Sequence, residues 1–194
     1  MRRLLFLFLW LTPLFADAAH QPAMWQVFYK QSFTGRNLST NPLTVGGLKG
    51  DAYDYKVILY KKSTGTNSQI FMRFNGDTGT NYRRYYLEGN SAGAVSAACY
   101  NAIESISTGP TGTESTASVT MFEIMGKSGS ERVASFTMSS TWNTAKYVYF
   151  GAQYWKNTAD ELTSLVFFSN DNVSQDFDLI ILQKPKLAQD AEWE

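Results

Sequence analysis

Two acidic residues lie inside apolar segments of the chain and are the first candidates for chemistry. Glu123 lies in the segment MFEIM, and Glu88 ends the segment YYLE. Two carboxylates that face each other across a concave sheet can hydrolyse glycosidic bonds. Glu123 alternates with Phe122 and Ile124, so we expect it to point outward from a sheet whose inner face carries those neighbours. The sequence therefore favours solvated strand carboxylates over a paired-acid site, and it predicts no enzyme activity and no catalytic residue.

The counts of histidine and cysteine exclude several other kinds of site. His20 is the only histidine and Cys99 the only cysteine. A histidine-based triad, a His/Cys metal cage and an intrachain disulfide are therefore excluded. Because Ala97, Ala98 and Tyr100 surround Cys99, we expect its thiol to be buried.

A polar loop in the segment Ile70–Glu88, IFMRFNGDTGTNYRRYYLE, is the next candidate. An alternating strand, a glycine-containing turn and a second aromatic strand are typical of a β-hairpin. The glycines can take positive φ, and the Asn and Asp side chains can bind loose backbone amides. A calcium loop is disfavoured, because its twelfth position is Tyr86 rather than glutamate, and we predict no metal and no cofactor. The loop residues are Asn75, Gly76, Asp77, Gly79 and Asn81.

Exposed aromatic residues could bind carbohydrate without a catalyst, because their rings stack on sugar faces. Tyr147 and Tyr149 alternate with Val148 and Phe150, so we expect the tyrosines to face away from the most apolar layer. Together with Trp155, they are the candidate sugar-stacking residues. The alternative is that these rings belong to the core.

The charge balance argues against nucleic acid as a partner. The 194 residues include 17 Lys and Arg and 17 Asp and Glu, so the formal net charge is zero. A neutral chain lacks the basic surface that drives non-specific nucleic-acid binding. Arg83 and Arg84 fall on opposite faces of one expected strand and do not form a groove for a single strand.

The N-terminus has the pattern of a secretory signal peptide. Two arginines precede an apolar run over residues 4–11, and Ala16-Asp17-Ala18 gives an A-x-A cleavage site at Ala16 and Ala18. The apolar stretch is too short to cross a hydrocarbon core of about 30 Å, so no stable transmembrane span is expected. The alternative is a hydrophobic N-terminal arm that docks on a neighbouring subunit. We expect the signal or arm over residues 1–18, a single domain over 19–184 and a polar tail over 185–194.

Hydrophobic periodicity predicts an all-β domain. Apolar residues after position 20 recur with a period of two, and Gly, Ser, Thr and Asn clusters separate about nine such segments. Without helices for parallel crossovers, the expected fold is an antiparallel two-sheet β-sandwich of jelly-roll or concanavalin-like topology. Residues 91–104 are expected to be irregular or one short helix. The polar run 109–116 is expected to be a flexible connection inside the domain.

Three motifs in order carry a resemblance to a known family. They are RFNGDTGTNY over residues 73–82, WKNTA with LTSL over residues 155–165, and FDLIIL over residues 177–182. The chain resembles small tailed-phage and prophage virion proteins over roughly residues 53–184. The resemblance implies a strand–loop hairpin, a final strand that closes the sandwich, and no catalytic residues.

These observations lead to two expectations for function. The first is a non-enzymatic structural or surface subunit of a virion, associated with the tail or capsid, with host adhesion as a further role. Its partners would be copies of itself, other virion subunits or a cell-surface glycan. The alternative is a secreted carbohydrate-binding module. The expected location is the virion, or outside the cytoplasm after export.

Overall fold

The chain forms an all-β, two-sheet structure, which confirms the predicted fold class. A computed structural model describes residues 24–62, 69–108, 117–142 and 145–186. Within these ranges every regular element is a strand, and all pairs are antiparallel. The finer jelly-roll or concanavalin-like topology stays a prediction. Ala16 and Ala18, the run 109–116 and most of the expected tail lie outside the described residues.

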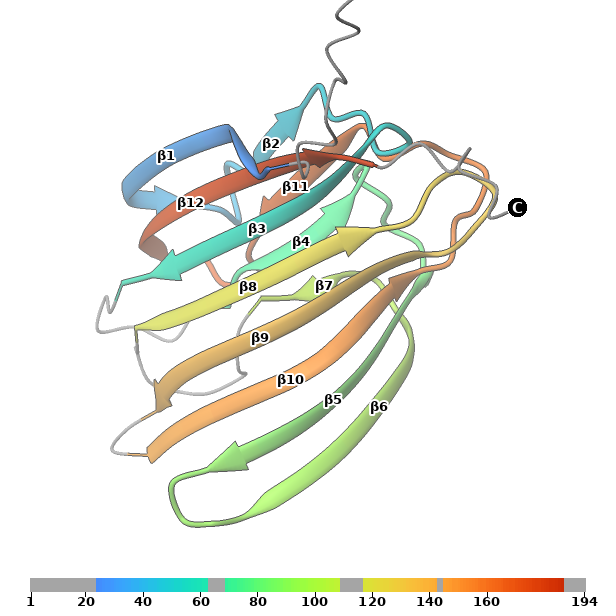
Figure 1. Cartoon of the computed structure of the whole chain (residues 1–194). Helices are drawn as coiled ribbons and strands as arrows, with labels where there is room; N and C mark the ends of the chain where they lie inside the picture. Colours follow the sequence, from blue (N-terminus) through green and yellow to red (C-terminus); the bar gives the residue numbers. More distant parts are fainter. Residues whose placement is uncertain (1–23, 63–68, 109–116, 143–144, 187–194) are drawn as a thin grey trace, which may run out of the picture.

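The strands divide into an eight-stranded and a four-stranded sheet (Figure 1). The larger sheet has the order β1-β12-β3-β8-β9-β10-β5-β6, and the smaller has the order β2-β11-β4-β7. The strands are β1 (Gln26–Asn37), β2 (Leu43–Gly46), β3 (Tyr53–Lys61), β4 (Phe71–Phe74), β5 (Tyr82–Asn90), β6 (Val95–Ile103), β7 (Ile106–Ser107), β8 (Ser118–Met125), β9 (Arg132–Trp142), β10 (Ala145–Trp155), β11 (Ser164–Phe168) and β12 (Ser174–Pro185).

Alternation of buried and accessible residues explains why the central segments, such as β3, β8 and β12, form strands. In β8, Phe122 and Ile124 are buried while Met121 and Met125 are exposed. Because side chains alternate between the faces of a strand, one face of each central strand joins the core. The core lies between the sheets, where Phe74 of the smaller sheet packs edge-on against Trp155 of the larger, with ring centroids 5.6 Å apart.

The expected β-hairpin over residues 70–88 is wrong. Its two strands, β4 and β5, belong to different sheets, so the loop between them crosses the sandwich. The backbone of β4 pairs instead with β11 and β7, while β5 pairs with β10 and β6. Alternation in each strand was correctly interpreted, but it does not specify which strand is the partner.

The structure of residues 91–104 also differs from the expected irregular segment or short helix. They form a turn and then β6, which pairs antiparallel with β5 from Gly89↔Val95 to Tyr82↔Ile103. Ala92, Ala98 and Ala102 have a spacing that would place them near one face of a helix. This spacing is coincidental, since cross-strand pairing with β5 overrides a weak local preference. With β2, β6 and β7 included, the described residues hold twelve strands rather than about nine.

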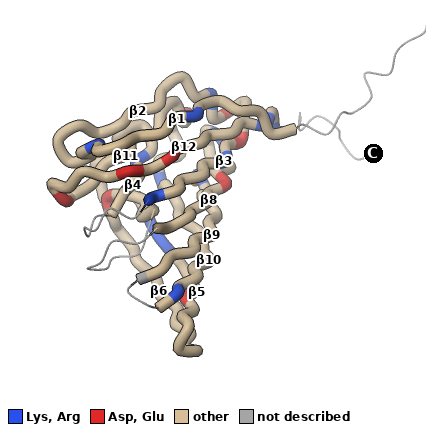
Figure 2. The backbone as a smooth tube through the Cα atoms, turned by 90° about the vertical axis from the view of Figure 1, so that its left-hand side faces the viewer, with Lys and Arg blue, Asp and Glu red and all other residues tan. Residues whose placement is uncertain are grey.

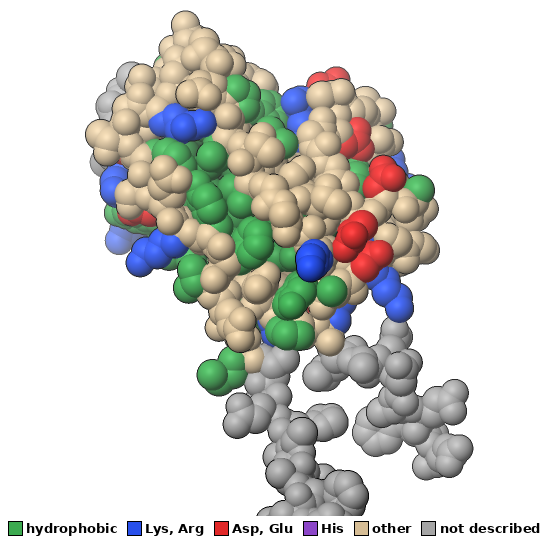
Figure 3. All heavy atoms as spheres, turned by 90° about the horizontal axis from the view of Figure 1, so that it is seen from above, with side chains coloured by type: hydrophobic (Ala, Val, Ile, Leu, Met, Phe, Trp, Pro, Cys, Tyr) green, Lys and Arg blue, Asp and Glu red, His purple; other side chains and the backbone are tan. Residues whose placement is uncertain are grey.

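The larger sheet extends past the smaller one. Figure 2 shows β5 and β6 continuing beyond the region where the smaller sheet faces the larger. On the inner face of β5, Tyr82 is fully buried, but Arg84, Tyr86 and Glu88 are only half-buried. The opposite end, which carries β1 and β2, displays hydrophobic side chains beside charges of both signs (Figure 3).

Candidate functional site

The loop over residues 75–81 is bound to the rest of the sandwich through Asp77. The Asp77 carboxylate accepts hydrogen bonds from Trp155 Nε1 at 2.6 Å, Asn81 Nδ2 at 2.9 Å and the Gly79 backbone N–H at 2.8 Å. Burial acts to raise the Asp77 pKa, but these three donors outweigh it and the pKa is lowered. The carboxylate is thus committed to holding the loop on β10.

Asn75 forms the second attachment of the loop. Its side-chain oxygen accepts hydrogen bonds from the Thr163 backbone N–H at 2.8 Å and the Ser164 N–H at 3.0 Å, and its Nδ2 donates to the Glu161 carbonyl at 2.7 Å. Asn75 has φ of 53°, a left-handed conformation that asparagine tolerates. The NGDTG segment and the segments around Trp155 and Thr163 therefore lie together and stabilise one another.

Asn75 and Asp77 are accordingly engaged in structural contacts of the loop. Across the ranges that the structure describes, no group of three or more His, Cys, Asp or Glu residues is arranged to hold a metal ion. Gly76 has φ of 69°, which explains the glycine at that position. Thr78, Thr80 and Asn81 are the exposed residues of the loop.

Two of the three predicted sugar-stacking residues are not accessible. Trp155 is fully buried against Phe74, and Tyr149 is 9% exposed, so neither ring can stack on a sugar in this structure. Tyr147 is half-buried. The expected orientation was wrong because the outer face of β10 is left uncovered: Val148 and Phe150 are exposed there, 41% and 54%, and the tyrosines point inward.

Four tyrosines form a continuous strip on the inner face of β10, β5 and β6. Tyr100 and Tyr86 have ring centroids 6.1 Å apart with nearly parallel planes, Tyr86 and Tyr149 are 5.7 Å apart, and Tyr149 and Tyr147 are 6.2 Å apart. Tyr100 is 43% exposed, so the strip becomes more accessible toward β6. We call this set of four residues the tyrosine strip.

Two charged side chains border the tyrosine strip. The Arg84 guanidinium lies 5.1 Å from the Tyr86 ring centroid and 4.6 Å from that of Tyr100. At the other end, Glu88 hydrogen-bonds Tyr149, whose pKa is raised first by burial and then by the Glu88 charge. Sequence analysis missed Arg84, Tyr86 and Tyr100 as a group because β6 was not recognised as the partner of β5. The sequence does place Arg84, Tyr86 and Glu88 at every second position of one strand, and therefore on one face.

The outer face of the same three strands carries a contiguous apolar patch. Leu87 lies directly between Phe150 and Ala97 in the register, and Tyr85 lies between Ala152 and Cys99. A hollow of about 600 Å³ opens over these residues. We call this surface the outer apolar patch; its exposed large side chains are Tyr85, Leu87, Val95, Val148 and Phe150.

Cys99 belongs to the outer apolar patch and is exposed, so the expectation of a buried thiol is wrong. Its small neighbours were interpreted as core residues. They lie instead on β6, an edge strand with no sheet packed over its outer side. An apolar composition at this position therefore marks a surface.

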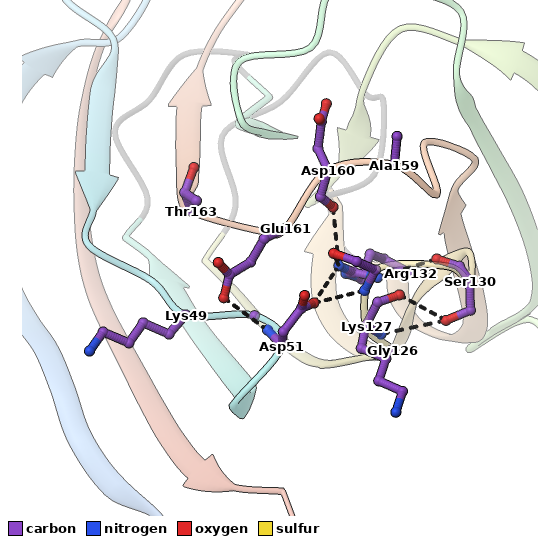
Figure 4. Close-up of polar contacts among 12 residues, drawn as sticks. Lys49, Asp51, Gly126, Lys127, Ser130, Arg132, Ala159, Asp160, Glu161 and Thr163 are labelled. Carbon is purple, nitrogen blue, oxygen red and sulfur yellow. Dashed lines mark hydrogen bonds and ion pairs between the residues drawn. The ribbon is translucent and has the colours of Figure 1, made fainter.

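An ion pair between buried Arg132 and exposed Asp51 lies at the same end of the sandwich as the polar loop (Figure 4), because Arg132 pairs with Trp155 in the register of β9 and β10. Arg132 is 1% exposed, and its guanidinium donates to Asp51 Oδ1 at 3.0 Å and to the Asp160 carbonyl at 3.1 Å. Asp51 also accepts from the Ser128 N–H at 2.7 Å, and its own N–H donates to Glu161 at 3.2 Å. Each acid here is occupied by a structural partner.

Glu123 lies on the outer face of the larger sheet, as expected from its alternation. It forms an ion pair with Lys56 at 2.6 Å and keeps 45% of its side chain exposed. Phe122 and Ile124 are buried on the opposite face. Glu88 points to the inner face, so the two candidate acids do not face each other.

Comparison of the chain with family models, curated proteins and solved structures finds no match. Within the described residues, no helix is long and apolar enough to cross a membrane. The candidate site is therefore assigned from the geometry of this chain.

Proposed function

We propose that the chain is a non-enzymatic structural subunit of a virion surface or similar assembly, and that it associates with copies of itself through the outer apolar patch. The observation that carries the proposal is the exposure of this patch: Val95 is 78% exposed, Leu87 56% and Phe150 54%. Contiguous exposed apolar surface of this kind is typical of protein–protein contacts. The three sequence motifs that resemble phage virion proteins support the virion context.

The shape of the patch supports a second copy as the partner. Ala97 and Ala152 are small residues that line the hollow, while Leu87 and Phe150 project beside it. A surface with both a projecting ring and a hollow can pack against its own copy across a two-fold axis, each ring entering the other hollow. Such contacts bury apolar side chains at the centre of an interface.

The edge strand β6 of the larger sheet is a further reason to expect association with a second copy. Among the described strands, β6 pairs only with β5, so its outer backbone groups are free to pair with another strand. Unprotected edges of this kind favour association with a second sheet. The free edge and the outer apolar patch adjoin one another along β6.

Sedimentation velocity of the purified domain tests the proposal. We expect a dimer or larger species for the natural chain, and a monomer for Phe150→Asp, because a carboxylate in the contact would be buried without a partner. Val27→Asp is the matched control, since Val27 is 64% exposed on β1 at the other edge of the sheet. A monomeric natural chain, or equal loss in both variants, would contradict the proposal.

The virion context is tested separately by mass spectrometry of purified particles. We expect this chain among the particle proteins, and its first residue there would show whether residues 1–18 are removed. Detection only in the culture medium, with residue 19 first, would instead favour export as a free module.

A second candidate function is that of a secreted carbohydrate-binding module. The accessible Tyr100 end of the tyrosine strip is the specific observation in its favour, because an exposed ring beside the Arg84 guanidinium is suited to stack on a sugar and orient its hydroxyls. The two functions use opposite faces of the same strands, so variants of one face discriminate between them.

A further inference from the structure

We propose that the tyrosine strip, with Arg84 and Glu88, is a binding site for an acidic oligosaccharide, whose carboxylate pairs with Arg84 while a neighbouring sugar ring lies toward Glu88. The inference goes beyond assembly through the outer apolar patch and does not depend on it. It names a ligand class for the opposite face of the same strands.

The end of the tyrosine strip nearest β6 is accessible to a ligand. The smaller sheet reaches the larger one at Gln153, where the Ser107 N–H donates to Gln153 Oε1 at 3.2 Å and Gln153 Nε2 donates to the Ser107 carbonyl at 3.0 Å. Gln153 pairs with Arg84 in the next strand of the larger sheet. Beyond Arg84, toward the free edge of the larger sheet, Tyr100 of β6 is 43% exposed and Tyr86 of β5 is half-buried.

Tyr100, which is 43% exposed, and the half-buried Tyr86 supply the stacking surface, while Tyr149 is buried and continues the row of rings into the core. Three successive centroid distances of 6.1, 5.7 and 6.2 Å join Tyr100, Tyr86, Tyr149 and Tyr147 in one row. The hydroxyl of Tyr86 is hydrogen-bonded to Tyr100, which fixes the two rings against each other. A platform held in this way loses little side-chain entropy when a ligand stacks on it.

Arg84 supplies the selectivity for an acid. In the described part of the chain, no carboxylate lies within ion-pair distance of its guanidinium, and its Nε is buried without a hydrogen-bond partner. The guanidinium is therefore a cation without a described acidic partner, beside the rings of Tyr86 and Tyr100. A guanidinium binds a carboxylate through two parallel hydrogen bonds, so an acidic sugar would satisfy the charge.

Glu88 gives the site a direction. Its carboxylate lies four residues after Arg84 on the same face of β5 and accepts a hydrogen bond from Tyr149. A second carboxylate there would be repelled, whereas a sugar hydroxyl could donate to it. The acidic sugar is therefore placed at Tyr100 and Arg84, and a hydroxyl of the neighbouring sugar ring at Glu88.

Calorimetric titration of the purified chain with matched saccharides tests the proposal. The probes are tetragalacturonate against galactotetraose and sialyllactose against lactose, with a short oligothymidylate as a further arm. We expect at least one acidic saccharide to bind more tightly than its neutral counterpart. Arg84→Gln should weaken that binding about tenfold and abolish the preference, as expected for loss of a charged hydrogen bond.

Variants on the two faces provide the controls. Tyr100→Ala should weaken the acidic and neutral saccharides alike, since it removes a stacking surface. Arg83→Gln and Tyr85→Ala, which alter adjacent residues on the outer face, should leave binding within about twofold. Circular dichroism checks that each variant remains folded.

Three results would overturn the proposal. One is equal affinity, or no affinity, for both acidic saccharides and their neutral counterparts at millimolar concentration. The second is an equal effect of Arg83→Gln and Arg84→Gln. The third is tighter binding of oligothymidylate than of any saccharide with loss in Arg84→Gln, which would make the strip a single-strand nucleic-acid site.

Discussion

The Asp77 carboxylate accepts a 2.6 Å hydrogen bond from the indole N–H of Trp155, 78 residues later in the chain. Trp155 is fully buried, and its ring packs edge-on against Phe74, which lies just before the loop that contains Asp77. One aromatic residue thus joins the crossing loop, the smaller sheet and the end of β10. This hydrogen bond explains why the NGDTG segment has an aspartate at position 77.

Removal of the Asp77 carboxylate is predicted to destabilise the fold. In Asp77→Ala the buried Trp155 N–H loses its acceptor, which should lower the free energy of unfolding by about 1–3 kcal/mol. Urea denaturation measures the change. Thr80→Ala, an exposed substitution in the same loop, should shift it by less than about 0.5 kcal/mol. In a double-mutant cycle with Trp155→Phe, additive effects would contradict the assigned contact.

Stability is predicted to fall in acid through Asp77 and Asp51. Burial opposes ionisation of both groups, but hydrogen bonds lower both pKa values: Trp155, Asn81 and Gly79 act on Asp77, and Ser128, with the Arg132 charge, acts on Asp51. A carboxyl with a lowered folded pKa contributes stability above its unfolded pKa of about 3.9, and loses it as pH falls through the folded value.

Thermal unfolding between about pH 6 and pH 2.5 measures this dependence. The melting temperature should stay nearly level down to about pH 4.5 and then decline. The double variant Asp51→Asn with Asp77→Asn should show a shallower decline, because amides do not titrate. An unchanged slope in the double variant would show that other groups govern the acid response.

Much of the fold could be predicted because alternation in a strand directly reports burial. The segments around Val57, Phe122 and Leu179 were correctly assigned as strands, and all three residues are buried in the core. Burial on one face of a sandwich requires alternation, so the signal is strong wherever a second layer covers the strand.

The candidate site could not be predicted in the same way, because it lies where the second layer ends. Outward-facing Leu87 and Phe150 are as apolar as core residues, so their sequence gives no sign that nothing covers them. The assignment of Tyr149 to a surface and Cys99 to the core failed for this reason. Partner choice failed likewise, since Asn75 and Asp77 bind residues far along the chain.

Gly151 is predicted to be required by the curvature at the tyrosine strip. A Cβ built there would overlap the Tyr85 carbonyl oxygen and lie 2.9 Å from both Phe136 Cε1 and Tyr86 Cα. Two of these obstacles are backbone atoms, so Gly151→Ala should lower the free energy of unfolding by about 1–3 kcal/mol or more. Gly89→Ala is the control, because no atom lies within 4 Å of its added Cβ. Equal urea midpoints for the two variants would contradict this close approach.

The exposed thiol of Cys99 is predicted to report on assembly. It lines the hollow of the outer apolar patch together with Leu87 and Phe150, so packing of a second copy would cover it. Reaction with a thiol-specific chromophoric disulfide should therefore slow as protein concentration rises. In Phe150→Asp, the rate should stay fast at every concentration because the copies do not associate. Labelling that is equally fast for the natural chain at low and high concentration would place the contact elsewhere, since a thiol inside a formed interface cannot meet the reagent until the subunits separate.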